Sequence, residues 1–389
     1  AVLKALEQPP LDVLIVLASF RAEGTPRLAL DFCEYWTRWG LNVGIVDLRR
    51  GANDLRDAFV DRDIAIFDLP TGHHGVFRYL KLTVGAFHLV RRLRPTAVLS
   101  TLSGLHAFLL MGSRLAGCSC TVVHQGVYPW FWKRGFWKYK AEYQIGRPFV
   151  SRVVACSRYV ADGVVEHFGV PAARVEVVYN GVLAPSIEDE LADRSTANPD
   201  NIPVVTMVGR IDQTKDYDLL ISTAAICRDQ GLALHWRFIG DGEDRVRLEA
   251  RVKQLGLSDQ VEFLGWRNDV PALLRTSSIF AYAAKREEGF GIALVEAMAA
   301  AVPVVATDVP ACREVLSDGE LGALVAAGDP AALAAGIADV LAQPERTAER
   351  AAAAREKALS VFSAETMARR YAEILGLPVP PEPAAVDRG

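Results

Sequence analysis

The stretch Glu288–Met298 reads EGFGIALVEAM, and it decides the fold predicted for this chain. It joins a glycine-rich turn to the start of a predicted helix, and it follows Ser278–Ala283, an apolar run that predicts a buried strand. Such a turn lies at the carboxyl end of its strand, where open α/β sheets bind ligands. The start of the helix presents backbone amides to an anion. The stretch therefore predicts an anion-binding strand–turn–helix unit.

Two carboxylates bracket this turn. Glu288 lies in the turn, and Glu296 lies about two helical turns farther along. The two side chains can therefore meet different parts of one ligand. A ligand that has phosphates at one end and hydroxyl groups elsewhere, such as a nucleotide sugar, suits this arrangement. The alternative is an ordinary strand–turn–helix with two solvated glutamates.

A second predicted anion site lies upstream, in Val204–Tyr217. An apolar strand ends at Gly209, and Arg210 and Lys215 follow in the loop before the next helix. Arginine can bind two phosphate oxygens at once and lysine supplies a compact charge, so the pair suits a diphosphate. The alternative is a solvated loop.

Together, these motifs resemble the donor site of retaining glycosyltransferases of family 4, which have the GT-B fold. The resemblance continues through Phe238–Gly242, Val261–Gly265 and Pro303–Asp308, and it ends near Val325. It implies an α/β protein with two Rossmann-like, doubly wound domains that face each other across a cleft. It also implies a nucleotide diphosphate sugar as the donor substrate.

The resemblance assigns a role to individual residues. It implies that Glu296 binds the ribose of the nucleotide, that Glu288 contacts the transferred sugar, and that Arg210 and Lys215 stabilise the leaving diphosphate. It implies no metal and no cofactor. Asp241–Asp244 could form an acidic metal site, but its position after a strand favours helix capping. The other residues implied to bind the donor are Gly24, Gly209, Thr214, Trp266, Arg267, Asn268, Gly289, Phe290, Gly291 and Ile292.

The amino-terminal half is expected to bind the acceptor, which could be a small molecule, a glycan or a lipid-linked sugar. His124 resembles the histidine that these enzymes place near the donor sugar, and the alternative is a structural histidine. Gly24 lies in a loop that departs from the paired glycines common in the family. Residues 128–140 are rich in aromatic and basic side chains and predict a lid over the acceptor, a packed segment or a peripheral membrane contact.

Composition and patterning agree with a two-domain enzyme. The 389 residues are too many for one ordinary core, and the formal net charge of -4 gives no overall basic signature for nucleic acid. No apolar run reaches the length of a membrane span, and we expect a cytoplasmic protein with reduced cysteines. The predicted domains are 1–182 together with a crossing helix in 363–389, and 203–362, joined by a polar linker at 183–202.

The resemblance thus implies a retaining hexosyltransferase that uses a UDP- or GDP-sugar without a metal. A sugar-nucleotide epimerase or phosphorylase of the same fold remains an alternative, as does a non-catalytic sugar-nucleotide sensor. A nicotinamide dehydrogenase is disfavoured, because no Gly-x-Gly-x-x-Gly turn follows the first predicted strand.

Overall fold

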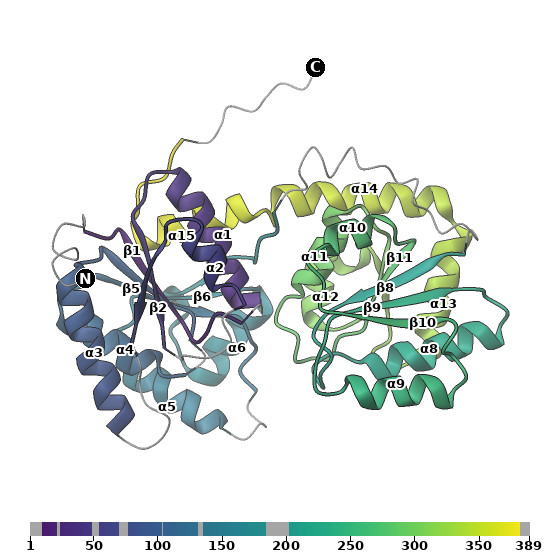
Figure 1. Cartoon of the computed structure of the whole chain (residues 1–389), viewed down its shortest axis with the longest axis horizontal. Helices are drawn as coiled ribbons and strands as arrows, with labels where there is room; N and C mark the ends of the chain where they lie inside the picture. The colour runs from purple at the N-terminus through teal and green to yellow at the C-terminus, as the bar shows by residue number, and fades with distance from the viewer. Residues whose placement is uncertain are drawn as a thin grey trace. The chain divides into compact units, whose positions relative to one another are not determined.

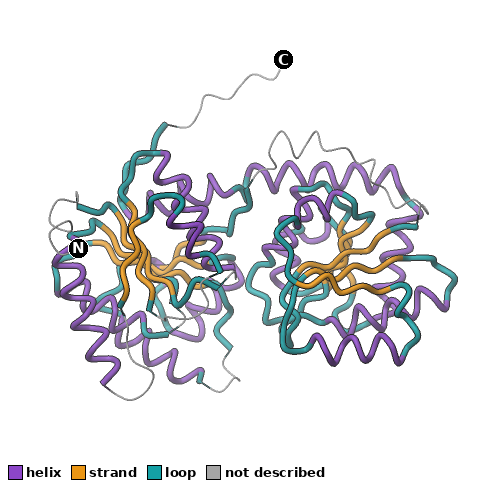
Figure 2. Tube along the Cα trace, viewed as in Figure 1, coloured by secondary structure: helices purple, strands orange, loops and turns teal. Residues whose placement is uncertain are grey.

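The chain folds into two compact units. The computed structural model describes residues 10–21, 24–48, 54–69, 77–102, 104–130, 135–183 and 202–381. Unit 1 comprises Ala1–Tyr179 with Ala364–Gly389, and unit 2 comprises Asn180–Ser363 (Figure 1). Each unit is built around a parallel sheet covered by helices, so the predicted pair of Rossmann-like domains is confirmed (Figure 2). Of the predicted linker at 183–202, residues 184–201 lie outside the described residues.

The sheet of unit 1 has the order β3-β2-β1-β4-β5-β6-β7, and every neighbouring pair is parallel. Its inner strand β1 is buried along its whole length, as expected of an apolar run covered on both faces. Because the chain leaves β1 first toward β2 and later toward β4, the strand order reverses between β1 and β4. The strands are β1 (Val13–Leu17), β2 (Val43–Asp47), β3 (Ala65–Asp68), β4 (Ala97–Ser100), β5 (Cys120–Gln125), β6 (Arg152–Ala155) and β7 (Val175–Val177).

Helices cover both faces of this sheet. Figure 1 shows α1 and α15 on one face and α3, α4 and α5 on the other. The helices of unit 1 are α1 (Gly24–Arg38), α2 (Arg56–Val60), α3 (Phe77–Leu93), α4 (His106–Leu115), α5 (Phe136–Gly146), α6 (Arg158–Phe168) and α15 (Ala364–Leu375), with a 3₁₀ turn, η2 (Ala172–Arg174).

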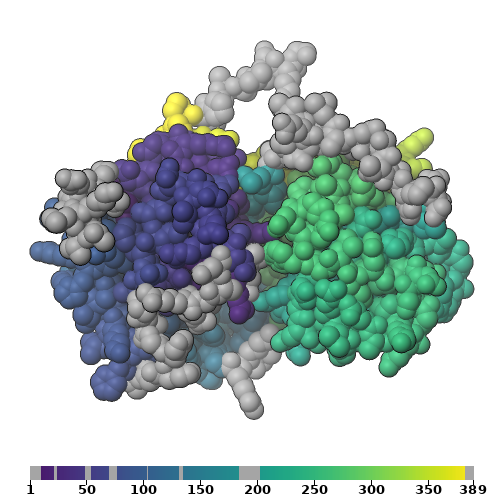
Figure 3. All heavy atoms as spheres, in the orientation of Figure 1, coloured from purple at the N-terminus to yellow at the C-terminus, as the bar shows by residue number. Residues whose placement is uncertain are grey.

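The last helix, α15, packs on the amino-terminal unit. The indole nitrogen of Trp36 in α1 donates to the carbonyl oxygen of Ala368, 3.0 Å away. The rings of Phe32 and Tyr371 lie 4.7 Å apart. In the space-filling view, the yellow carboxyl-terminal residues lie against the purple amino-terminal ones (Figure 3). The end of the chain therefore completes the core of unit 1.

Unit 2 repeats the same plan. Its sheet has the order β10-β9-β8-β11-β12-β13, again with every pair parallel. The strand order reverses between β8 and β11. The strands are β8 (Val204–Val208), β9 (His235–Ile239), β10 (Val261–Gly265), β11 (Ile279–Tyr282), β12 (Val304–Thr307) and β13 (Ala323–Val325).

A capping aspartate precedes helix α13 of unit 2. Asp329 accepts hydrogen bonds from the amides of Ala331 and Ala332 at 2.9 and 3.0 Å, and Pro330 occupies the first turn. No helix among the described residues is both long enough and apolar enough to cross a bilayer. The helices are α8 (Tyr217–Asp229), α9 (Arg245–Gln254), α10 (Val270–Arg275), α11 (Ile292–Ala299), α12 (Pro310–Val315), α13 (Pro330–Ala342) and α14 (Pro344–Ser360), with a 3₁₀ turn, η3 (Ser317–Gly319).

Candidate active site

The two predicted anion-binding motifs lie side by side in unit 2. The loop that follows β8 and the turn that follows β11 meet where the strand order reverses, which is the usual ligand position in open α/β sheets. An antiparallel bridge between Lys215 and Ala284 joins the two segments. Residues far apart in the sequence therefore form one cluster at the carboxyl edge of the sheet.

Lys215, Tyr282 and Glu288 form the centre of this cluster. The ammonium group of Lys215 donates to the Tyr282 hydroxyl and to Oε2 of Glu288. The Tyr282 hydroxyl in turn donates to the same Oε2 at 2.7 Å. The side chains of Lys215 and Glu288 are only 14% and 15% exposed, so little water screens the pair. The cation is thus held at a fixed position by the buried Tyr282 and the largely buried Glu288.

The surroundings of Glu288 keep its carboxyl ionised. Burial acts to raise its pKa, but the nearby Lys215 ammonium and the hydrogen bonds from Lys215, Tyr282 and the Phe290 amide outweigh burial and lower the pKa from 4.5 to about 2. The amides of Gly289 and Phe290 donate to Oε1 at 3.1 and 3.3 Å. Phe290 is among the residues that the resemblance implies bind the donor, and in this structure its amide binds Glu288.

Arg210 is held by a neighbouring carboxylate. Its Nε lies 2.5 Å from Oδ2 of Asp212, while its side chain remains 58% exposed. The other oxygen of Asp212 accepts from the Thr214 amide at 2.9 Å and from the Thr214 hydroxyl. Burial acts to raise the pKa of Asp212, but the bonds from Thr214 and the charge of Arg210 lower it overall. Thr214 was predicted to bind the donor, and in this structure it hydrogen-bonds to Asp212, the residue that orients Arg210.

Glycines allow the loops after β8 and β9 to touch. Gly240 has φ +136°, and a Cβ there would lie 2.1 Å from the carbonyl oxygen of Gly209. A Cβ on Gly242 would lie equally close, 2.1 Å, to the carbonyl oxygen of Ile211. Any larger residue would push the loop that carries Arg210 and Lys215 away from the sheet edge. The Phe238–Gly242 motif thus supports the shape of the site.

The acids after β9 bind arginines. Asp241 accepts from the Gly242 amide at 2.8 Å and from Arg245 at 3.2 Å, and Asp244 lies 3.4 Å from Arg247. Asp244 precedes α9 but makes no side-chain bond to the backbone of that helix, so the expected capping role is wrong for this residue. Its negative charge still lies beside the positive end of the helix.

The turn before α11 ends in a left-handed glycine. Gly291 has φ +90°, and a Cβ there would approach the Tyr282 ring to 3.2 Å. Ile292 is the first residue of α11, so its amide is among those that find no acceptor within the helix. Glu296 lies on the same helix and is partly exposed. The ribose-binding role of Glu296 stays a prediction.

The loop predicted to lie beside the nucleobase is exposed. Trp266 follows β10 and is 51% exposed. Arg267 makes two bonds to Asp269, at 2.7 and 2.6 Å, and Asn268 between them is exposed. Since β9 separates β10 from β8, these side chains lie farther along the sheet edge than Lys215.

The structure places two predicted site residues in unit 1. Gly24 is the first residue of α1. His124 lies in β5, is 6% exposed, and its Nδ1 is 2.6 Å from the hydroxyl of Tyr371. Burial lowers the pKa of His124 to about 4, so the ring is neutral at physiological pH. Its contact with α15 gives His124 a structural role, and the predicted position near the sugar stays a prediction.

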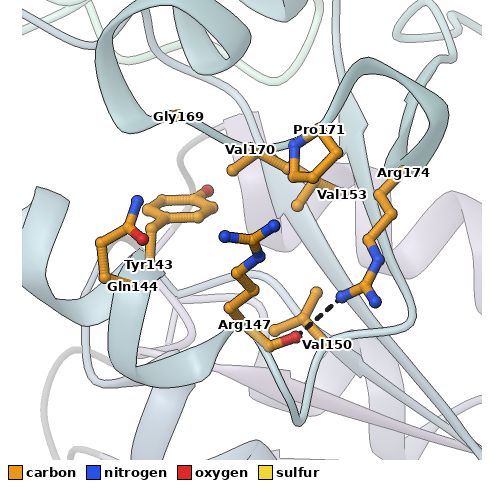
Figure 4. Close-up of a pocket in the computed structure, with 9 residues that line it drawn as sticks. All are labelled: Tyr143, Gln144, Arg147, Val150, Val153, Gly169, Val170, Pro171 and Arg174. Atoms are coloured by element: carbon orange, nitrogen blue, oxygen red, sulfur yellow. Dashed lines mark hydrogen bonds between the residues drawn. The ribbon is translucent and has the colours of Figure 1, made fainter.

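Unit 1 also contains a cavity that the sequence did not indicate (Figure 4). It lies where α5 and α6 end, at the edge of the sheet opposite the strand ends that bind ligands in such folds. The Arg174 guanidinium donates to the carbonyl oxygen of Arg147 at 2.8 Å across it. None of the predicted site residues lines this cavity. Its walls are Tyr143, Gln144, Arg147, Val150, Val153, Gly169, Val170, Pro171 and Arg174.

Sequence reasoning missed Tyr282, although this residue contacts both central charges. It ends the apolar run of β11 and reads as a core residue, and it is fully buried. One signal was available. A tyrosine at the carboxyl end of a buried strand needs a partner for its hydroxyl, and the adjacent turn supplies charged groups.

Comparisons with known proteins agree with this architecture. Residues 22–183 match Glycosyltransferase Family 4, and residues 188–357 match Glycosyl transferases group 1. The lipopolysaccharide core biosynthesis glycosyltransferase LpsE of Rhizobium meliloti is 31% identical over 177 residues, 46% of this chain and 51% of LpsE. The D-inositol 3-phosphate glycosyltransferase of Mycolicibacterium vanbaalenii is 32% identical over 219 residues, 52% of this chain and 48% of that protein. The chain thus spans about half the length of these curated relatives.

Solved structures share the fold over almost the whole chain. Anabaena HepE, determined in complex with UDP and glucose, superposes with a TM-score of 0.79 at 22% identity, covering 94% of this chain and 99% of HepE. At this identity the likeness shows the fold alone. The family matches to both halves are more specific, and they follow the order of the two units. The two halves of the chain therefore match two families of glycosyltransferase domain, Glycosyltransferase Family 4 in the first half and Glycosyl transferases group 1 in the second.

Proposed function

We propose that the protein is a retaining hexosyltransferase that moves a sugar from a UDP- or GDP-sugar to a hydroxyl group of an acceptor. The observation that carries this proposal is the buried Lys215–Tyr282–Glu288 cluster at the point where the strand order of unit 2 reverses. It combines a fixed cation for phosphate with an ionised carboxylate for sugar hydroxyls. The names of the relatives and the UDP bound to HepE support a nucleotide-sugar donor.

The cluster has bonding capacity left for a donor. An ammonium group has three N–H donors, and Lys215 directs two of them at Tyr282 and Glu288, which leaves one for a phosphate oxygen. Arg210 adds a second cation, and the start of α11 adds its backbone dipole. The Glu288 carboxylate can accept bonds from sugar hydroxyls while it remains bound to Lys215.

These groups suit the chemistry of the transfer. The bond between the anomeric carbon and the phosphate oxygen breaks, and the diphosphate gains negative charge that Arg210, Lys215 and α11 stabilise. The acceptor oxygen bonds to the anomeric carbon on the same face, and its proton passes to the departing phosphate oxygen. In this scheme the protein supplies the positive charge, so no metal ion is required.

Unit 1 supplies the acceptor site in this proposal. Its own strand order reverses between β1 and β4, and Gly24 begins the helix that follows β1. A small molecule, a glycan or a lipid-linked sugar could each offer the hydroxyl group.

A donor screen tests the proposed reaction. A UDP- or GDP-sugar at one hundred times its Kd should stabilise the folded protein by about 2.7 kcal/mol, detected as a rise in melting temperature. Turnover of that donor with hydroxyl acceptors should yield a product of unchanged anomeric configuration and should persist in EDTA. Donor conversion without an acceptor would indicate an epimerase, and binding without any product would indicate a sensor.

The two glutamates should respond differently to substitution. Glu296→Gln should weaken both the donor and the free nucleoside diphosphate by about ten- to hundredfold, because the ribose is common to both ligands and hydrogen bonds to charged groups are strong. Glu288→Gln should weaken the donor more than the nucleoside diphosphate. Titration calorimetry with both ligands measures the difference, and exposed Glu356→Gln in α14 serves as the control. Equal losses for both ligands in Glu288→Gln would place this residue away from the sugar.

A further inference from the structure

Positive charge is concentrated in one part of unit 1. Residues 69–161 contain 13 Lys and Arg residues and a single acidic residue, Glu142. The whole chain has 43 basic and 47 acidic residues, so the residues outside 69–161 include 30 basic and 46 acidic ones. Glu142 is only 3% exposed, and its carboxylate accepts from the Leu105 amide at the start of α4. This stretch of an otherwise acidic protein thus contributes no exposed carboxylate of its own.

Helix α3 adds an exposed apolar stripe to this region. Phe77, Leu80 and Val84 are 76%, 61% and 45% exposed, and their spacing places them on one face of the helix. Lys81 lies on the same face and is exposed. The opposite face, which includes Leu82, is buried in unit 1. Large apolar side chains grouped in this way on a surface indicate an interaction site.

Helix α5 adds exposed side chains on the same side of the sheet (Figure 1). Trp137 is 75% exposed, and Lys138 beside it is exposed as well. Helix α4 links the two helices, because the Thr83 hydroxyl in α3 donates to the carbonyl oxygen of Phe108 at 3.1 Å and Glu142 in α5 accepts from the Leu105 amide. Figure 1 shows both helices on the same side of the sheet. We define the α3–α5 surface as Phe77, Leu80, Lys81, Val84, Trp137 and Lys138.

The aromatic and basic segment at 128–140 divides into two parts. Trp130 is 8% and Phe136 is 7% exposed, and Tyr128 stacks on Tyr159 at 4.2 Å. These rings are packed, whereas Trp137 points outward. Residues 131–134 lie outside the described residues. The exposed interaction surface is therefore centred on α3, with α5 at its border, and not on the whole segment.

We propose that the α3–α5 surface binds an anionic lipid bilayer. Exposed aliphatic and aromatic side chains can enter the boundary between headgroups and acyl chains, while lysines on the same face meet lipid phosphates. A nucleic acid could bind the cations and stack on Trp137, but it has no apolar region that would bury Leu80 and Val84. The proposal does not depend on the transfer reaction, because neither α3 nor α5 carries a donor-site residue.

Vesicle flotation of the full chain tests this proposal. The protein should float with vesicles of phosphatidylcholine mixed with phosphatidylglycerol, and salt should weaken that binding. Lys81→Glu should lower partitioning by about fivefold or more, because each cation near an anionic surface contributes about that factor. The double variant Phe77→Ser and Leu80→Ser should lower it by about tenfold or more, because two apolar side chains can no longer be buried.

Val246→Ser provides the matched control. Val246 is 78% exposed at the start of α9, a helix that also carries arginines, but there Arg245 and Arg247 pair with Glu249 and Asp218. This variant should float as the unchanged protein does. Circular dichroism and thermal melting verify that each variant is folded.

Three results would overturn the proposal: no flotation with the mixed vesicles, equal flotation with vesicles of phosphatidylcholine alone, or unchanged flotation of the folded Phe77 and Leu80 variant. Retention on heparin distinguishes binding to a bilayer from binding to other polyanions. Lys81→Glu should reduce retention on heparin, whereas the apolar variant should not. If Lys81→Glu weakens binding to both vesicles and heparin while the Phe77 and Leu80 variant weakens neither, the surface binds soluble polyanions or an acidic protein instead.

Discussion

Replacing Lys215 with alanine should lower the rate of sugar transfer by about a hundred- to a thousandfold, the scale found when one preorganised donor to a developing negative charge is removed. It should also lower the free energy of unfolding by about 3 kcal/mol, because the buried carboxylate of Glu288 loses its counter-charge. Steady-state kinetics and urea unfolding measure the two effects separately.

Two further variants separate the catalytic loss from the structural one. Adding Glu288→Gln to Lys215→Ala removes the unpaired charge, so much of the lost stability should return while the rate stays low. Arg210→Ala should lower the rate with little change in stability, because the Arg210 side chain is 58% exposed. A normal rate in folded Lys215→Ala would remove this residue from the diphosphate site.

The sheets could be predicted from the sequence because their strands are buried on both faces. The continuous apolar run Leu11–Ala18 contains β1, and the short, largely apolar run Ala97–Ser100 forms β4. No strand was predicted for β13, because Ala323–Val325 is too short to carry a periodic signal. These residues form a strand by pairing with β12. Short strands depend on their neighbours in space, which a local pattern does not contain.

The site was predictable as separate motifs, but its bonding was not. The glycine-rich turn and the basic loop identified Glu288 and Lys215, yet these residues are 73 positions apart and their ion pair depends on which strands are neighbours. The same holds for Glu288 and the Phe290 amide, whose bond depends on how the turn closes. Residue type and spacing thus predicted which groups are present, whereas tertiary packing determines which groups bind each other.

Acid should destabilise the protein through Glu288 by about 3 kcal/mol between pH 5 and pH 2. Folding lowers the pKa of this carboxyl from 4.5 to about 2, so in this range the unfolded chain takes up a proton that the folded protein excludes. The stabilisation is complete above pH 4.5 and is lost as the pH falls toward 2. A difference of about 2.5 pH units corresponds to about 3 kcal/mol.

Comparison with Glu288→Gln isolates this contribution. The amide cannot titrate and leaves Lys215 without its counter-charge, so the variant should be less stable than the unchanged protein at pH 7. As the pH falls from 5 to 2, the unchanged protein loses the stabilisation from Glu288 while the variant has none to lose, and the gap between their free energies of unfolding should narrow. Urea unfolding at a series of pH values measures both curves, and other carboxyls affect the two proteins alike. A constant gap over this range would mean that Lys215 and Tyr282 do not hold Glu288 ionised in the folded state.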